Sequence, residues 1–169
     1  MAAAQLSSIK WSDGTPMASV GIANRSNVAL REVPVALRAA VIASEDRGFY
    51  DHAGFSLRGI SRAFFSDVRG GPTEGGSTIT QQYAKNAYLS HDRTIVRKVR
   101  ELLLALKLET RVDKNQIFQD YLNTIWFGRN SYGVQAAANA YFGLPVDKLD
   151  IAQCTMLATL VRAPALYDP

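Results

Sequence analysis

Three short stretches of the sequence carry side chains whose types and spacing suit proton transfer or anion binding. The first is residues 45–54, where Glu45 is followed by Asp46 and His52 and would lie at the C-terminal end of a helix. A helix dipole disfavours a carboxylate at that end, which suits a general base. The alternative is a solvent-exposed loop that caps the helix. His52 and His91 lack the spacing of a zinc site.

The second stretch, residues 75–86, places a pair of glycines before the predicted start of a helix. Backbone N–H groups at such a start attract phosphate, and glycines let a ligand approach them closely. Thr78, Gln82 and Lys85 share one helix face, so Lys85 is placed to reach a second phosphate oxygen. The alternative is an ordinary capped surface helix behind a flexible loop.

The third stretch lies in a helix predicted over residues 94–110. Arg97 and Lys98 fall within about 60° of Glu101 around the helix, and most other positions are apolar. An all-round apolar helix is usually buried, and a buried carboxylate between two cations is costly unless it is paired or used. The pattern indicates a buried or half-buried Glu101 used in a site, and the plain alternative is a structural ion pair between Arg97 and Glu101.

The elements that position these stretches are predicted to be almost entirely helical. Apolar periodicity and capping residues indicate helices over residues 34–44, 57–68, 78–88, 94–110, 113–123, 131–142 and 150–163. Pro34 suits the first position of its helix, and Asp113 and Asp150 suit N-caps. Thr78 with Gln81 matches a capping box. A glycine at position 143 is expected to end the helix before it.

The remaining segments are two short strands and two loops. The strands, over residues 8–11 and 17–23, flank a turn at Asp13 and Gly14. Residues 44–54 and 69–76 are predicted loops, and the glycine-rich second loop is expected to be the most flexible part of the chain. The sum is a mostly α domain with one short N-terminal β piece.

Length and composition favour one globular domain. The chain has 169 residues, of which 47% are hydrophobic and 20% charged. Its formal net charge of +4 suits an anionic ligand or a membrane surface as well as nucleic acid. The single cysteine, Cys154, excludes an internal disulfide and any zinc site built from several cysteines. No stretch approaches the roughly 20 apolar residues that span a bilayer.

The three stretches, in this order, resemble motifs of the peptidoglycan glycosyltransferase domain. This domain (glycosyltransferase family 51) occurs in monofunctional transglycosylases and at the N-terminus of class A penicillin-binding proteins. Residues 45–54, 75–86 and 97–109 are similar to its first three motifs, and residues 114–128 and 157–164 to its fourth and fifth. Tyr83, where an aliphatic residue is common, and Phe118 with Gln119, where Leu and Glu are common, depart from the pattern.

The resemblance implies a mostly α, lysozyme-like fold with a larger head lobe and a small, flexible, membrane-facing jaw lobe. Residues 1–32 would form an N-terminal linker or hairpin segment, and residues 33–169 the catalytic domain. The best candidate for the jaw is the amphipathic segment from Ile60 to Phe65, where Phe64 and Phe65 lie beside Arg62. The alternative is that both phenylalanines are core residues.

The resemblance also implies an activity, the polymerisation of lipid II. The 4-hydroxyl of the acceptor GlcNAc attacks C1 of the donor MurNAc. The donor is the growing glycan chain, which is attached to undecaprenyl diphosphate. The product is a β-1,4 linkage, formed with inversion. By motif position, Glu45 is the general base and Glu101 the second catalytic carboxylate. The substrate-binding residues implied are Asp46, Phe49, His52, Ser77, Thr78, Gln82, Lys85, Asn86, Arg97 and Lys98.

Cofactors and partners follow from the same resemblance. A divalent cation, Mg²⁺ or Mn²⁺, on the diphosphate is compatible with it but not required, and Glu101 is the candidate ligand. The donor site is expected to bind moenomycin-type inhibitors, and no nucleic acid is expected as a partner. The protein is expected at the outer face of the bacterial cell membrane, held by an anchor that precedes Met1.

Two other functions compete with this one. A lysozyme-like hydrolase or lytic enzyme would share the glycan and a catalytic glutamate. It would not need Lys85, Arg97 and Lys98, because a neutral glycan has no diphosphate to hold. A non-catalytic wall-binding domain would not need Glu45 and Glu101.

Overall fold

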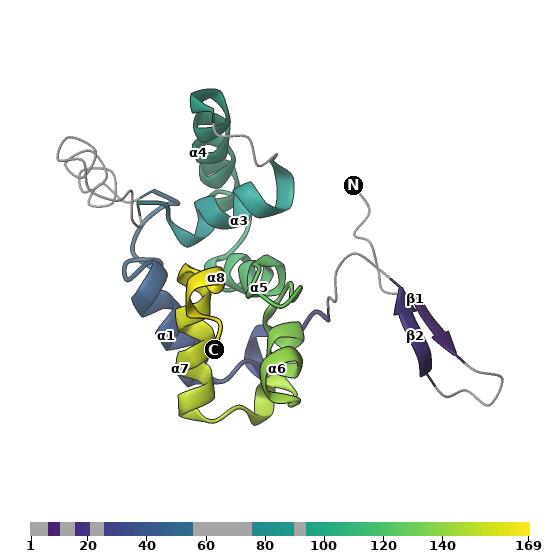
Figure 1. Ribbon diagram of the computed structural model, residues 1–169. Coiled ribbons are helices and arrows are strands. Elements are labelled where there is room, and N and C mark those ends of the chain that lie inside the picture. Colours follow the sequence, from purple (N-terminus) through teal and green to yellow (C-terminus); the bar gives the residue numbers. More distant parts are fainter. Residues whose placement is uncertain (1–6, 11–15, 21–25, 56–75, 90–93) are drawn as a thin grey trace.

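The computed structural model in Figure 1 describes residues 7–10, 16–20, 26–55, 76–89 and 94–169. Within these ranges the chain is mostly helical, and the only sheet has two strands. This confirms the mostly α class. The predicted helix 57–68, the jaw candidate from Ile60 to Phe65 and nearly all of the loop 69–76 lie outside the described residues.

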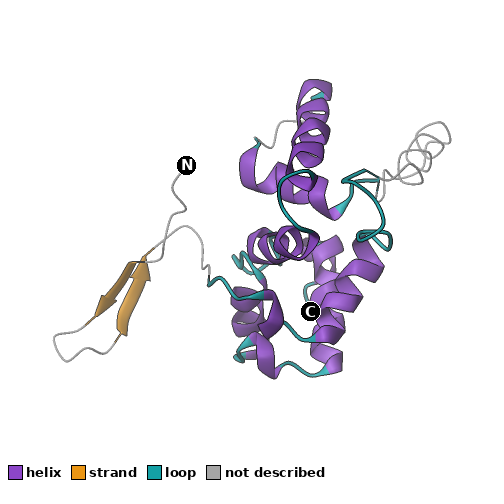
Figure 2. Ribbon diagram, turned by 180° about the vertical axis from the view of Figure 1, so that it is seen from behind, coloured by secondary structure: helices purple, strands orange, loops and turns teal. Residues whose placement is uncertain are grey.

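The N-terminal hairpin is confirmed. Strands β1 (Ser7–Lys10) and β2 (Pro16–Val20) pair antiparallel. Figure 2 shows the pair, in orange, standing apart from the helical body. The body contains η1 (Leu30–Glu32), α1 (Val35–Glu45), α3 (Ile79–Tyr88), α4 (Ile95–Glu109), α5 (Lys114–Thr124), α6 (Val134–Phe142), η2 (Val146–Lys148), α7 (Ile151–Arg162) and α8 (Pro164–Tyr167).

Helix ends agree with the capping residues of the sequence. Thr78, Asp113 and Asp150 each accept a backbone N–H of the first turn, and Gly143 ends α6 with a left-handed φ of 66°. Pro34 is the N-cap of α1 rather than its first residue. The capping box at Thr78 is only half formed, because the Gln81 side chain donates to another carbonyl instead of returning to the cap.

Two boundaries differ from the prediction near the C-terminal third. Helix α6 begins at Val134 rather than 131, because residues 126–132 form a tight turn with a bridge between Trp126 and Tyr132. The turn closes at Gly133, where φ is +88° and an added Cβ would lie 2.8 Å from the carbonyl oxygen of Asn123. The short helix α8, which begins at Pro164, was not predicted.

The core lies between α1, α5, α6 and α7. Helices α1 and α7 pack side by side, and α5 contacts α3 and α6 (Figure 1). Leu37 and Val41, four residues apart on α1, and Leu157 and Leu160 on α7 are fully buried. None of the described helices combines the length and the apolar character needed to cross a bilayer.

The apolar pattern of α4 favoured a buried helix, and this is wrong for most of its residues. Helix α4 packs mainly on α3 and leaves its outer face uncovered by described residues. Ile95 and Leu103 are 85% and 61% exposed, and Val96 and Val99 are also exposed. Only Glu101 and Ala105 are buried. The helix therefore turns Glu101 inward, whereas the Lys98 side chain is 49% exposed.

Candidate active site

Glu45 is the last residue of α1, and its carboxylate meets the side of α3. Oε2 of Glu45 accepts a hydrogen bond of 2.8 Å from Nε2 of Gln82. The amide oxygen of Gln82 accepts one of 3.2 Å from the hydroxyl of Tyr121, on α5. Glu45 and Gln82 are half-buried. Among the described residues, no cation forms an ion pair with Glu45.

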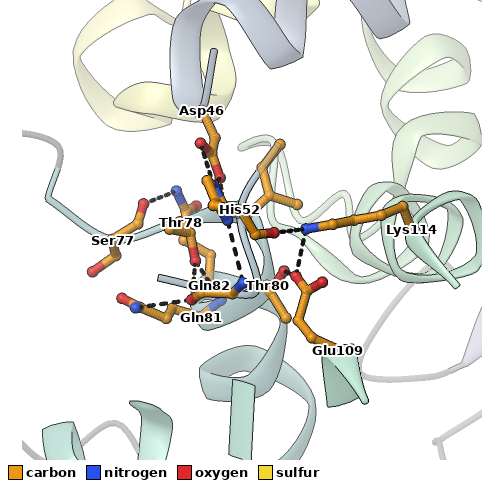
Figure 3. A network of polar contacts seen from close by, with 11 residues as sticks. Asp46, His52, Ser77, Thr78, Thr80, Gln81, Gln82, Glu109 and Lys114 are labelled. Atoms are coloured by element: carbon orange, nitrogen blue, oxygen red, sulfur yellow. Dashed lines mark hydrogen bonds and ion pairs between the residues drawn. The ribbon is translucent and has the colours of Figure 1, made fainter. Parts of the chain in front are cut away.

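Asp46, next in the chain, is buried and holds its neighbours (Figure 3). Both of its carboxylate oxygens lie 2.9 Å from Nε2 of His52. Oδ2 also accepts a hydrogen bond of 3.1 Å from the backbone N–H of Ile79. Nδ1 of His52 accepts from the backbone N–H of Gly54, so the network assigns the ring proton to Nε2. Asp46 thereby fixes the turn and complements the positive end of α3.

Gly54 is the point at which this turn meets α3 and α4. Its carbonyl accepts hydrogen bonds from Oγ1 of Thr78 at 2.9 Å and from Nε2 of Gln81 at 3.1 Å. Its φ is +80°, and an added Cβ would lie 2.9 Å from Cγ of Glu109 and 3.2 Å from the carbonyl oxygen of Ala105. Both the backbone conformation and the close approach to α4 therefore require glycine.

Lys114, at the start of α5, fastens the same turn from the other side (Figure 3). Its Nζ donates to the carbonyl of His52 at 2.6 Å and lies 2.8 Å from Oε1 of Glu109. That oxygen also accepts from Oγ1 of Thr80 at 2.5 Å. One ammonium thus ties the turn to α3, α4 and α5.

Phe49, predicted to shape the substrate site, is fully buried in the core. Its ring lies 5.7 Å from that of Phe118, and Nζ of Lys114 sits 4.5 Å from its centroid. The side chain can therefore shape the site only from beneath. Thr78 is likewise buried, and its hydroxyl is used in capping α3 and in holding Gly54.

Glu101 lies on the inner side of α4 with 1% of its surface exposed. Its Oε2 lies 2.5 Å from Nη1 of Arg97, and its Oε1 contacts Nζ of Lys98. The ion pair between Arg97 and Glu101 is therefore confirmed. Nζ of Lys98 also donates to Oγ of Ser77 at 2.6 Å, which joins this cluster to the residues that lead into α3.

A family model described as transglycosylase matches residues 13–169. The chain belongs to the transglycosylase family. Penicillin-binding protein 1A of Mycobacterium tuberculosis is 44% identical over 98% of the chain and 21% of its own length. Penicillin-binding protein 1F of Bacillus subtilis is 42% identical over 93% of the chain and 22% of its own length.

Monofunctional glycosyltransferase of Staphylococcus epidermidis is 43% identical over 87% of the chain and 58% of its own length. This transglycosylase chain thus spans about a fifth of the two penicillin-binding proteins and somewhat more than half of the monofunctional relative. The family that the motifs resemble is confirmed.

Lys85 and Asn86 of this transglycosylase lie further along α3 than Gln82, and both are partly exposed. None of the described residues accepts a hydrogen bond or forms an ion pair with the Lys85 ammonium. An unpaired, partly exposed ammonium is suited to an anionic ligand.

The donor set offered by the described residues does not fit a resident divalent cation. Across the described ranges, no three Asp, Glu, His or Cys side chains come together as metal ligands. Both oxygens of Glu101, the candidate ligand, are already paired with cations. A metal ion would have to displace Arg97 or Lys98.

Sequence reasoning missed the links between these residues. One such link is the hydrogen bond from Tyr121, on α5, to Gln82, on α3. Burial raises the pKa of the Tyr121 hydroxyl well above its usual range, and the charges of Glu45 and Asp46 raise it further. Burial also raises the pKa of Tyr83, with further contributions from Tyr88 and Asp120. Both hydroxyls therefore stay protonated, and no local sequence signal indicates their partners.

Proposed function

We propose that this domain polymerises lipid II into β-1,4 glycan strands, with inversion at the donor sugar and release of undecaprenyl diphosphate. The supporting observation is that two carboxylates, Glu45 and Glu101, are linked to the first part of α3 but have different neighbours. Glu45 meets a neutral amide, whereas Glu101 meets two cations. Membership of the transglycosylase family supports this reading over a lytic enzyme or a wall-binding domain.

Glu45 is the residue suited to act as general base. Its Oε2 is held by Gln82, whereas no described residue donates to Oε1. The acceptor 4-hydroxyl would give its proton to Glu45 as its oxygen forms a bond to C1 of the donor MurNAc. The bond from C1 to the diphosphate oxygen breaks, and its electron pair leaves with undecaprenyl diphosphate. A positioned base contributes about 10²–10⁴-fold to such a step.

The cations beside Glu101 suit the leaving group. A diphosphate is a good leaving group, so the main requirement is to stabilise the charge that develops on it. Lys98 has a side chain 49% exposed and Lys85 is partly exposed, so both ammonium groups can meet an anion. Glu101 would keep Arg97 and Lys98 in place, and every step is assigned to side chains of this chain rather than to a metal.

Location and inhibitor binding are part of the same proposal. Lipid II and its polymer carry a membrane lipid, so the domain would work at the outer face of the bacterial cell membrane. The segment from Ile60 to Phe65 would meet that membrane, and a moenomycin-type phosphoglycolipid would bind the donor side. The relatives named as penicillin-binding proteins and as a monofunctional glycosyltransferase support this setting.

The test is to incubate the chain with labelled lipid II and separate the products by size. The proposal predicts lipid-linked polymer, inhibited by moenomycin. Soluble fragments without polymer would instead favour the lytic alternative. Neither product in the presence of intact protein would favour a binding domain.

A further inference from the structure

A chain of two hydrogen bonds runs from the core to the proposed base. The hydroxyl of Tyr121 donates to Oε1 of Gln82 at 3.2 Å, and Nε2 of Gln82 donates to Oε2 of Glu45 at 2.8 Å. The three residues come from α5, α3 and α1. The base is therefore connected to the interior through one amide group.

The direction of this chain is set by its two ends and by a longer contact of 3.5 Å from Nε2 of Gln82 to the carbonyl oxygen of Ser77, which favours the same orientation. The Glu45 carboxylate requires a donor, so the NH₂ group of Gln82 must face it and the amide oxygen must face Tyr121. Tyr121 has no exposed surface, and its raised pKa keeps the hydroxyl protonated and able to donate. A reversed amide would place its oxygen against the carboxylate, which is unfavourable in a partly buried site.

The same amide also controls which carboxylate oxygen is available. Nε2 of Gln82 holds Oε2, and no described residue donates to Oε1. A donor on Oε2 stabilises the charged form of the carboxylate. The orientation of the amide thus affects the position of the Glu45 carboxylate and which of its oxygens has a hydrogen-bond donor.

We propose that Tyr121 is a positioning residue that, through Gln82, orients the Glu45 carboxylate and directs its Oε1 toward the acceptor hydroxyl. The inference rests on the proposed function, because it assigns Tyr121 to the same base. It differs from a packing role, in which the Tyr121 ring would matter and its hydroxyl would not. That ring stacks on Phe118, with 6.4 Å between centroids, and a phenylalanine would keep this contact.

The experiment is the pH profile of kcat for lipid II polymerisation by Tyr121→Phe. Loss of the hydroxyl removes the donor that holds the Gln82 amide oxygen, so the amide is less firmly oriented and its hydrogen bond to Oε2 of Glu45 is weakened. The acidic limb of the profile is expected to move up by roughly half to one pH unit. At neutral pH kcat is expected to fall ~3–10-fold, which corresponds to the free energy of one hydrogen bond. KM for lipid II is expected to stay unchanged.

A matched control is available one residue after Gln82. Tyr83 is also buried, and its hydroxyl lies 3.3 Å from that of Tyr88 and 3.4 Å from Oδ2 of Asp120. Tyr83→Phe therefore removes a buried hydroxyl without touching Glu45. The acidic limb of the kcat profile of Tyr83→Phe should lie at the same pH as in the wild type. Circular dichroism and thermal unfolding of both variants would show whether each is folded.

A second variant tests the route. In Gln82→Met the acidic limb should already have moved, and adding Tyr121→Phe should move it no further. An unmoved limb in folded Tyr121→Phe, with an active wild type, would overturn the inference and leave the proposed function intact. A further shift in the double variant would also overturn it, since Tyr121 would then act by another route. A wild type that makes no polymer would overturn the proposed function, and the inference with it.

Discussion

The two glutamates of this site differ in almost every respect that governs a carboxylate. Glu45 ends a helix, is half-buried and meets one neutral amide. Glu101 lies inside a helix, is 1% exposed and is paired with two cations. Two carboxylates in different environments can take different catalytic roles, because the environment of each one determines how readily it exchanges a proton. Under the proposed function, proton transfer would fall to Glu45 and the holding of cations to Glu101.

The largest expected effect is on catalysis at Glu45. Glu45→Gln keeps the shape of the side chain but removes the base, so the polymerisation rate should fall about 10³-fold. Because Glu45 has no ion pair with a described residue, the free energy of unfolding should change by less than about 1 kcal/mol. A variant that keeps most of its activity would remove Glu45 from the role of base.

Next in size is the effect on stability at Glu101. Glu101→Gln leaves Arg97 and Lys98 beside each other without their counter-charge, which should lower the free energy of unfolding by about 2–3 kcal/mol. This loss of stability is smaller than for a fully buried ion pair, because the Lys98 side chain is 49% exposed and solvent screens its charge. Urea denaturation measures it.

The matched control for Glu101 is an exposed ion pair. Asp147 and Lys148 lie 3.2 Å apart, with side chains 47% and 68% exposed. Asp147→Asn should change the free energy of unfolding by less than about 0.5 kcal/mol. Equal losses in the two variants would contradict the claim that Glu101 is a buried, paired charge.

A smaller effect is expected where the turn after Glu45 meets α4, the helix of Glu101. Gly54→Ala introduces a Cβ 2.9 Å from Cγ of Glu109 at a φ of +80°, so unfolding should become easier by about 2 kcal/mol. Gly143→Ala is the control, because φ is +66° but nothing lies within 4 Å of the added Cβ. Its cost should be about 1 kcal/mol. Equal losses of unfolding free energy in the two variants would contradict a close contact between Gly54 and α4.

The smallest expected effect concerns Lys98 alone. Lys98→Met removes one half-exposed ammonium and should raise KM for lipid II about fivefold, equivalent to about 1 kcal/mol. Raising the salt concentration should weaken wild-type binding more than that of the variant. A kinetic titration at two ionic strengths measures both. An unchanged KM would place the diphosphate elsewhere.

Local features of the fold could be predicted from sequence because they depend on neighbours in the chain. Thr78, Asp113 and Asp150 cap their helices through residues two or three positions away, so the pattern alone indicates them. The pair Arg97 and Glu101, one helical turn apart, was predictable for the same reason.

Contacts between distant segments were not predictable. Gln82 meets Glu45 across 37 positions, and Lys114 meets His52 across 62. Such contacts depend on how α1, α3 and α5 cross, which no local pattern encodes. The burial of Phe49, and an outer face of α4 that no described residue covers, depend on the same packing. Apolar composition predicted a buried α4, but the position of this helix beyond α3 decides which face is covered.

The most direct test of the two roles is the pH profile of polymerisation by Glu101→Gln, measured where circular dichroism shows that it is folded. If Glu45 is the base, this variant should be slower at every pH but keep the acidic limb of the wild type. Glu45→Gln, measured beside it, should lose the limb together with most of its rate. Loss of the acidic limb in Glu101→Gln, with the limb kept in Glu45→Gln, would contradict the account.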